Sequence, residues 1–92
     1  MSYRFLMELR HLRYFVAVAA HGSFNRAAEI LHLTQPALSR QVKDLEEELG
    51  VPLLVRSQNK VELTESGGLF YDEAREVIGE PRTGLRAKVQ GQ

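Results

Sequence analysis

The sequence predicts a mainly helical domain made of four helices and one two-stranded β-hairpin. Apolar residues recur three and four positions apart along most of the chain, which is the spacing of amphipathic helices. Two short apolar runs flank a polar loop at residues 57–60, a pattern that is typical of a hairpin. A chain of 92 residues can bury one modest core, so we expect a single domain.

Charge is separated along the chain, although the 12 basic and 12 acidic side chains cancel in total. Basic residues outnumber acidic ones between residues 1 and 43, whereas acids gather at 44–48 and again at 72–80. A neutral total is therefore compatible with a basic face opposite an acidic one. We interpret residues 44–48 as a solvated helix face that points away from nucleic acid.

The first helix is expected from about Leu9 to His21, ended by Gly22. Its basic residues before an apolar run resemble a secretory signal, but the run is short for that role. We interpret it as a core helix because its apolar residues share one face. These are Leu9, Leu12, Val16, Ala19 and Ala20.

Two further helices are predicted, with a tight turn at residues 31–33 between them. Ser23 and Thr34 are suitable N-caps for them, because their hydroxyls can accept a hydrogen bond from an unpaired backbone N–H of the first turn. The second helix should bury Ala27, Ala28 and Leu31. The third should bury Leu38, Val42, Leu45 and Leu49, and end at Gly50.

The hairpin is expected to pair residues 53–56 with 61–64, and to pack on the helices because so small a ribbon is unstable alone. Thr64 then caps a fourth helix from about Glu65. Glycine and proline at 79, 81 and 84 should interrupt this helix. Its apolar side is predicted to comprise Leu69, Phe70, Ala74, Val77 and Ile78.

The outward face of the third helix suits nucleic acid. Gln35 and Ser39 carry hydrogen-bonding groups sized for base edges, and Arg40 and Lys43 carry cations. Recognition helices that follow a tight turn present their first residues to bases. Gln35 can pair with an adenine edge, and Arg40 with either guanine or phosphate.

Several segments together resemble the winged helix-turn-helix domain of LysR-type transcriptional regulators. They are residues 9–20, Gly22-Ser23-Phe24 with Ala27-Ala28, residues 34–41, Leu45-Glu46 with Leu49-Gly50, and Leu63-Thr64 with Gly67. The resemblance runs from Met7 to about Ile78. It implies an N-terminal extension at 1–6, a winged helix-turn-helix domain at 7–64 and a linker or dimerisation helix at 65–92, interrupted near 79–84.

The family resemblance also implies a function. Such a protein is a bacterial, cytoplasmic, nucleoid-associated regulator that binds double-stranded promoter DNA as a homodimer or a dimer of dimers. Its third helix enters the major groove and its hairpin wing reaches the adjacent minor groove. The larger effector-binding domain of the family is absent from this chain, so we expect no small-molecule ligand, cofactor or membrane partner here.

Side-chain chemistry and the family resemblance together predict which residues contact DNA. We expect Pro36 and Ala37 to meet a thymine methyl, and Ser23, Asn25 and Thr34 to divide between capping and phosphate contact. Phosphate contact is also expected from Arg26, Lys43, Arg56 and Lys60, with solvated surface charge as the alternative for Lys43. The full DNA-contacting set is Ser23, Asn25, Arg26, Thr34, Gln35, Pro36, Ala37, Ser39, Arg40, Lys43, Arg56, Asn59 and Lys60. Dimerisation is assigned to Leu69, Phe70, Ala74, Val77 and Ile78.

Other function classes have little support in the sequence. The chain has no cysteine, and His11, His21 and His32 are too scattered for a metal site. No catalytic arrangement stands out, so we do not expect an enzyme. Core packing or dimer contact is the interpretation for Phe15, Phe24, Phe70 and Tyr71. The main alternative function is a protein-interaction module that uses the fourth helix and does not bind DNA.

Overall fold

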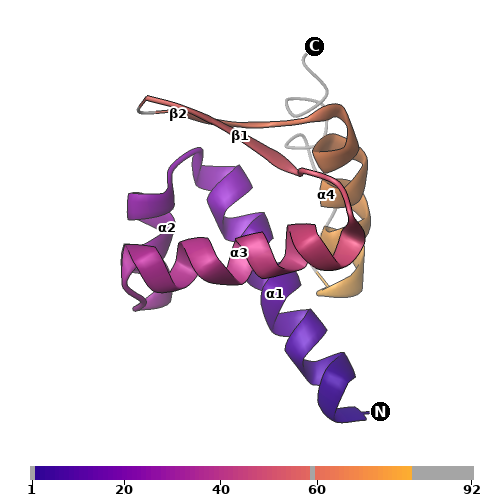
Figure 1. The fold of residues 1–92 in the computed structure, drawn as a ribbon. Coiled ribbons are helices and arrows are strands. Elements are labelled where there is room, and N and C mark those ends of the chain that lie inside the picture. Colours follow the sequence, from indigo (N-terminus) through magenta and orange to yellow (C-terminus); the bar gives the residue numbers. More distant parts are fainter. Residues whose placement is uncertain (1, 59, 80–92) are drawn as a thin grey trace.

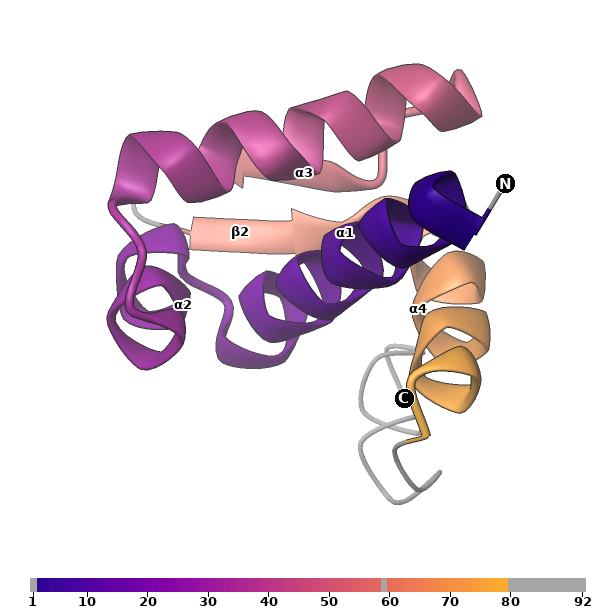
Figure 2. The ribbon, with the colours of Figure 1, turned by 90° about the horizontal axis from the view of Figure 1, so that it is seen from below.

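A computed structural model describes residues 2–58 and 60–79, and it has the predicted order of four helices and one hairpin (Figure 1). The elements are α1 (Ser2–His21), α2 (Phe24–Leu31), α3 (Gln35–Leu49), β1 (Leu54–Ser57), β2 (Lys60–Leu63) and α4 (Glu65–Val77). Helix α3 lies across α1, and the hairpin runs alongside α3 from the α4 side toward α2 (Figures 1 and 2). The predicted fold class is confirmed.

Helix α1 is the centre of the domain, because it contacts α2, α3 and α4. It supplies residues to both hydrophobic clusters of the core. The first cluster contains Phe15, Val16, Leu45, Leu53, Tyr71 and Ala74. The second contains Val18, Phe24, Ala27, Ala28, Leu38 and Val42. The expected core role of Phe15, Phe24 and Tyr71 is therefore confirmed.

The extent and buried face of α1 differ from the prediction. The helix begins at Ser2, earlier than the expected start near Leu9. Ala20 is exposed, whereas Phe15 and Val18 are fully buried. Because α1 has neighbours on several sides, it buries residues on more than one face. The prediction of a single apolar face therefore underestimates how many of its residues are buried.

The turn between α2 and α3 is found where it was predicted. His32 follows the last residue of α2 with a left-handed backbone (φ 60°), and the Leu33 N–H then donates to the Ala28 carbonyl at 2.9 Å. Leu33 is partly buried in the cluster that contains Leu38, so these two side chains fix how the chain enters α3.

The inward stripe of α3 is correct for three of its four residues. Leu38, Val42 and Leu45 are buried, but Leu49 is 42% exposed. Leu49 is the last helical residue, and the chain reverses at Gly50, whose φ of 79° favours glycine. The stripe therefore loses its cover in the final turn.

The hairpin is shifted by one residue from its expected bounds. Its antiparallel register pairs Leu54 with Leu63 and Ser57 with Lys60. Leu53 precedes the ladder and is fully buried. Leu54, Val61 and Leu63 pack against the helical core, as the small size of the ribbon requires.

Helix α4 begins in close contact with the chain before β1. The Thr64 Oγ1 accepts from the Gly67 N–H at 2.9 Å and donates to the Pro52 carbonyl at 2.7 Å. A Cβ atom on Gly67 would lie 2.0 Å from the Leu53 carbonyl oxygen, so only glycine allows this approach. The helix ends at Val77, just before the interruption predicted near residues 79–84. Residues 80–92, which include most of the predicted interruption, lie outside the described residues.

The apolar side predicted for α4 is only partly buried. Ala74 is 1% exposed, and Phe70 and Ile78 pack against the first core cluster. Leu69 and Val77 are 67% and 55% exposed, so no neighbour within this single chain covers them. The helix instead turns Tyr71, Asp72 and Arg75 inward. Periodicity locates the apolar residues of a helix but does not show which of them a neighbour covers.

Candidate nucleic-acid interface

The start of α3 is held by local hydrogen bonds and faces solvent. The Thr34 Oγ1 accepts from the Ala37 N–H at 3.2 Å, which confirms its capping role. Pro36 occupies the first turn, where no backbone donor is needed. Six residues form what we call the outer face of α3, each exposed or half-buried and outside the buried stripe. They are Gln35, Pro36, Ala37, Ser39, Arg40 and Lys43.

Two of the cations predicted to contact DNA project from this region. Arg40 and Lys43 are both exposed. A depression of about 350 Å³ is lined by Pro36, Ala37, Arg40 and Gln41. Apolar surface and a guanidinium thus share one shallow site, as contact with a thymine methyl and a neighbouring base requires.

The start of α2 lies beside the outer face. The Ser23 Oγ accepts from the Arg26 N–H at 3.1 Å, so its predicted capping role is also confirmed. An accepting hydroxyl keeps its own hydrogen, which remains able to donate to a phosphate oxygen. Asn25 and Arg26 are exposed in the same first turn.

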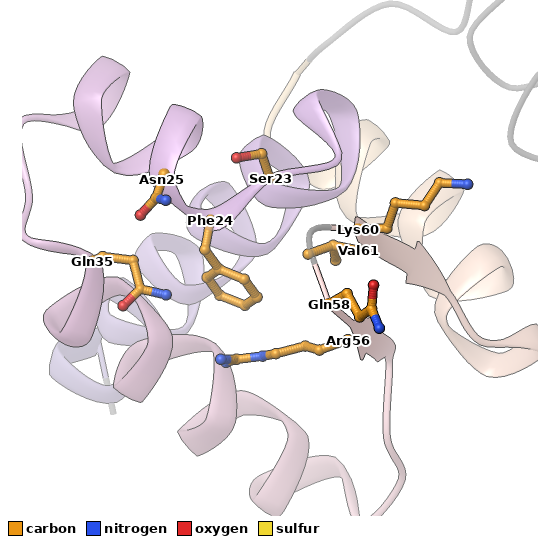
Figure 3. A pocket seen from close by; sticks show the side chains of 8 residues that line it. All are labelled: Ser23, Phe24, Asn25, Gln35, Arg56, Gln58, Lys60 and Val61. Atoms are coloured by element: carbon orange, nitrogen blue, oxygen red, sulfur yellow. The ribbon is translucent and has the colours of Figure 1, made fainter.

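A groove of about 380 Å³ joins α2, α3 and the hairpin (Figure 3). This hairpin groove is lined by Ser23, Phe24, Asn25, Gln35, Arg56, Gln58, Lys60 and Val61. Five of these were predicted site residues, taken from three separate segments of the chain. Sequence reasoning missed Phe24, Gln58 and Val61 as groove residues, because none of them carries a local signal for that position. Asn59 lies outside the described residues.

Arg56 and Ser39 were each expected to contact DNA, and the structure joins them to each other. The Arg56 Nη2 donates to the Ser39 Oγ. The Arg56 guanidinium carbon also lies 3.9 Å from the centroid of the Phe24 ring, an attractive cation–π arrangement. Figure 3 shows the Arg56 side chain extending across the groove beside this ring.

Lys60 is placed differently from Arg56, although both lie on the hairpin. Its side chain is 75% exposed and points away from Phe24 (Figure 3). Its Nζ is 3.8 Å from a Glu62 carboxylate oxygen, and exposed pairs of this kind contribute little to stability. Lys60 is therefore accessible for an anionic partner.

Glu46 corrects the interpretation of residues 44–48 as a solvated face. One of its carboxylate oxygens accepts from the backbone N–H groups of Leu53 at 2.7 Å and Leu54 at 3.1 Å. Glu46 is half-buried, whereas Asp44, Glu47 and Glu48 are exposed. Glu46 thus ties the end of α3 to the start of β1.

The histidines and the long helix α1 add no further site. His11 is 7% exposed and packs inside the fold, whereas His21 and His32 are exposed. In the part of the chain that the structure describes, no three metal-binding side chains are grouped. Over the same residues, none of the helices is both apolar and long enough to cross a bilayer.

Comparison with known families identifies the fold. Residues 9–68 match the sequence model of the bacterial regulatory helix-turn-helix proteins of the lysR family. The chain belongs to the LysR family. Among its relatives is the probable cat1 operon transcriptional activator of Acinetobacter lwoffii, which is 55% identical over 73 residues, 79% of this chain and 24% of that protein. The Hca operon transcriptional activator HcaR of Escherichia coli is 54% identical over 83 residues, 89% of this chain and 28% of that protein.

Solved structures of LysR-family proteins agree with this assignment. The BenM DNA-binding domain in complex with benA site 1 DNA has a TM-score of 0.74 and 44% identity, covering 90% of this chain and 89% of that one. The CbnR DNA-binding domain in complex with DNA has a TM-score of 0.73 and 42% identity, covering 91% of this chain and 98% of that one. This LysR-family chain spans about a quarter of the length of the two activators.

Proposed function

We propose that this chain binds double-stranded promoter DNA sequence-specifically as the DNA-binding part of a LysR-type transcriptional regulator. The observation that carries the proposal is the outer face of α3, which carries polar and basic side chains and is exposed or half-buried, whereas Leu38, Val42 and Leu45 of the same helix are buried. A helix docked in the major groove needs this division between one packed side and one free side. The DNA complexes of BenM and CbnR support the same use of the fold.

The proposed roles follow from side-chain chemistry. Gln35 and Arg40 read base edges, and Pro36 and Ala37 supply apolar contact. Arg26, Lys43 and Lys60 neutralise phosphates. The hydroxyl hydrogens of Ser23 and Thr34 donate to phosphate oxygens while their oxygens cap the helices. Asn25 and Asn59 complete the proposed contacts at the start of α2 and in the wing.

Dimerisation is proposed through α4. Leu69 and Val77 are the exposed apolar residues of this helix, and a second copy would remove them from water. Phe70 and Ile78 border them and are half-buried. Ala74 supports this face from inside the core. We also propose a non-enzymatic role in the bacterial cytoplasm, at the nucleoid.

Selection from a random duplex pool tests the proposal, followed by binding measurements on the recovered duplex at several salt concentrations. Two related half-sites and a steep salt dependence are expected, because phosphate neutralisation releases counterions. A flat salt dependence, or no enrichment over the starting pool, contradicts the proposal. A chain that sediments as a dimer and leaves the duplex unbound would support the protein-interaction alternative instead.

A further inference from the structure

Strand β1 is fastened to α3 at two separate points. At its start, the Glu46 carboxylate accepts the backbone N–H groups of Leu53 and Leu54. Near its end, Arg56 donates to the Ser39 hydroxyl. Ser39 and Glu46 lie about two turns apart on the same face of α3, so the two attachment points are separated by roughly 10 Å along the helix. The direction of the wing relative to α3 is therefore fixed by side chains rather than by the short connection alone.

The Arg56 contact joins three elements. The side chain begins on β1, its guanidinium lies over Phe24 of α2, and its Nη2 reaches Ser39 of α3. Phe24 is 5% exposed and belongs to the second core cluster, so the ring is a fixed platform. A planar, weakly hydrated guanidinium can stack on the ring and donate to the hydroxyl at the same time. A lysine ammonium is not planar and lacks the fixed, divergent N–H donors of arginine.

We infer that Arg56 is a positioning residue, which sets the distance between the outer face of α3 and the wing by its contacts with Phe24 and Ser39. This inference rests on the proposed DNA-binding function. It replaces the expected direct phosphate contact of Arg56 with an indirect role: the residue keeps its protein partners when DNA binds. Lys60, which is exposed on the same hairpin, makes the phosphate contact.

The geometry is tested first without DNA, so that it does not depend on the proposed function. Nuclear magnetic resonance of the full chain should show ring-current shifts of the Arg56 δ and ε protons and cross-peaks to the Phe24 ring. Ser39→Ala should change the Arg56 ε signal. Arg56 side-chain shifts equal to those of an unstructured peptide overturn the inference, whether or not the chain binds DNA.

The role in DNA binding is tested by the salt dependence of affinity for the selected duplex. Arg56→Gln is compared with the matched control Lys60→Gln, because both remove one cation from the hairpin. Loss of a phosphate contact lowers the slope of log K against log[salt] by about 0.9. We expect this decrease in slope for Lys60→Gln. For Arg56→Gln we expect about tenfold weaker binding with the slope of the parent chain, since tenfold corresponds to one lost contact of about 1.4 kcal/mol. An equal decrease in slope for Arg56→Gln overturns the inference.

A double-mutant cycle tests whether Arg56 acts through Ser39. If it does, the loss of DNA affinity in the double variant Arg56→Gln with Ser39→Ala should be smaller than the product of the losses in the two single variants. The difference should be roughly threefold or more, as is usual for residues in contact. Lys60→Gln with Ser39→Ala is the control pair and should show the simple product. Arg56→Lys should not restore binding. A simple product for the Arg56 pair, or full rescue by lysine, overturns the inference.

The outcomes separate the two proposals. If the parent chain binds no duplex, the proposed function fails, and the resonance measurement still decides the contact geometry. If the parent binds and the Arg56 and Lys60 variants behave alike, the DNA-binding function stands and the positioning role fails. Thermal unfolding of each variant shows whether it is folded, and the resonance data on the parent decide the geometry even if Arg56→Gln does not fold.

Discussion

The Glu46 carboxylate accepts a hydrogen bond from the backbone N–H of Leu53 at 2.7 Å, and this bond joins the end of α3 to the residue before the wing. The same oxygen accepts from the next N–H, that of Leu54. Two backbone donors at the entry to β1 are thus satisfied by one side chain. An acidic residue in a run of exposed acids therefore has a structural role.

Glu46→Ala should lower the free energy of unfolding by about 2 kcal/mol, because it leaves two part-buried N–H groups without their acceptor. Urea denaturation followed by circular dichroism measures the change. Glu47→Ala, an exposed neighbour on the same helix, is the control and should change stability by less than about 0.5 kcal/mol. Equal effects of the two substitutions would show that Glu46 has no special structural role.

Gly67→Ala should destabilise the fold strongly. The added methyl would lie 2.0 Å from the Leu53 carbonyl oxygen and 2.9 Å from its carbonyl carbon, and neither backbone atom can move freely. We expect a loss of about 3 kcal/mol or more, at or beyond the upper end of ordinary overpacking. Ser66→Ala, at the exposed preceding position, should retain the parent melting temperature. A Gly67→Ala variant as stable as the parent would contradict the close packing of α4 on Leu53.

Arg40→Ala should relax sequence preference at one position of the selected site, at a cost of roughly 1 to 3 kcal/mol, if its guanidinium pairs with a base. Competition gel shifts with single-base variants of the duplex measure this. Lys43→Ala is the matched control, an exposed cation one turn further along α3. It should weaken binding to every variant by the same factor. Uniform weakening by Arg40→Ala would assign that residue to phosphate.

Leu69→Lys should weaken dimerisation about tenfold or more, because it places a charge on the most exposed apolar residue of α4 and costs at least one contact of about 1.4 kcal/mol. Sedimentation equilibrium gives the dissociation constant. Ile30→Lys is the control, since Ile30 is 51% exposed on α2, at the other side of the domain from α4 (Figure 1). An unchanged constant for Leu69→Lys would place the dimer contact elsewhere.

Features that depend on neighbours in sequence were predicted well. The caps at Ser23, Thr34 and Thr64, the turn at His32 and the inward residues Leu38 and Val42 all depend on positions within about one or two helical turns. Hydroxyl acceptors, left-handed turns and apolar periodicity each leave a local pattern. These patterns were sufficient to define the helix-turn-helix and the outer face of α3.

Features that depend on distant neighbours were not predicted. Nothing near Arg56 in the sequence indicates that its guanidinium will meet Phe24 and Ser39, because the contact exists only once the hairpin has folded back. Glu46 looks like the solvated acids beside it for the same reason. Leu69 was correctly identified as apolar, but its exposure depends on what α1 covers.

The central claim is that the outer face of α3 and the hairpin groove meet DNA. The most direct test is to titrate the isotope-labelled chain with the selected duplex and to record the shifts of its backbone amide resonances. We predict that the largest shifts fall on residues 23–26, 35–43 and 56–61, while the exposed acids at 44, 47 and 48 move little. Shifts confined to α4, or absent at saturating duplex, would contradict the account.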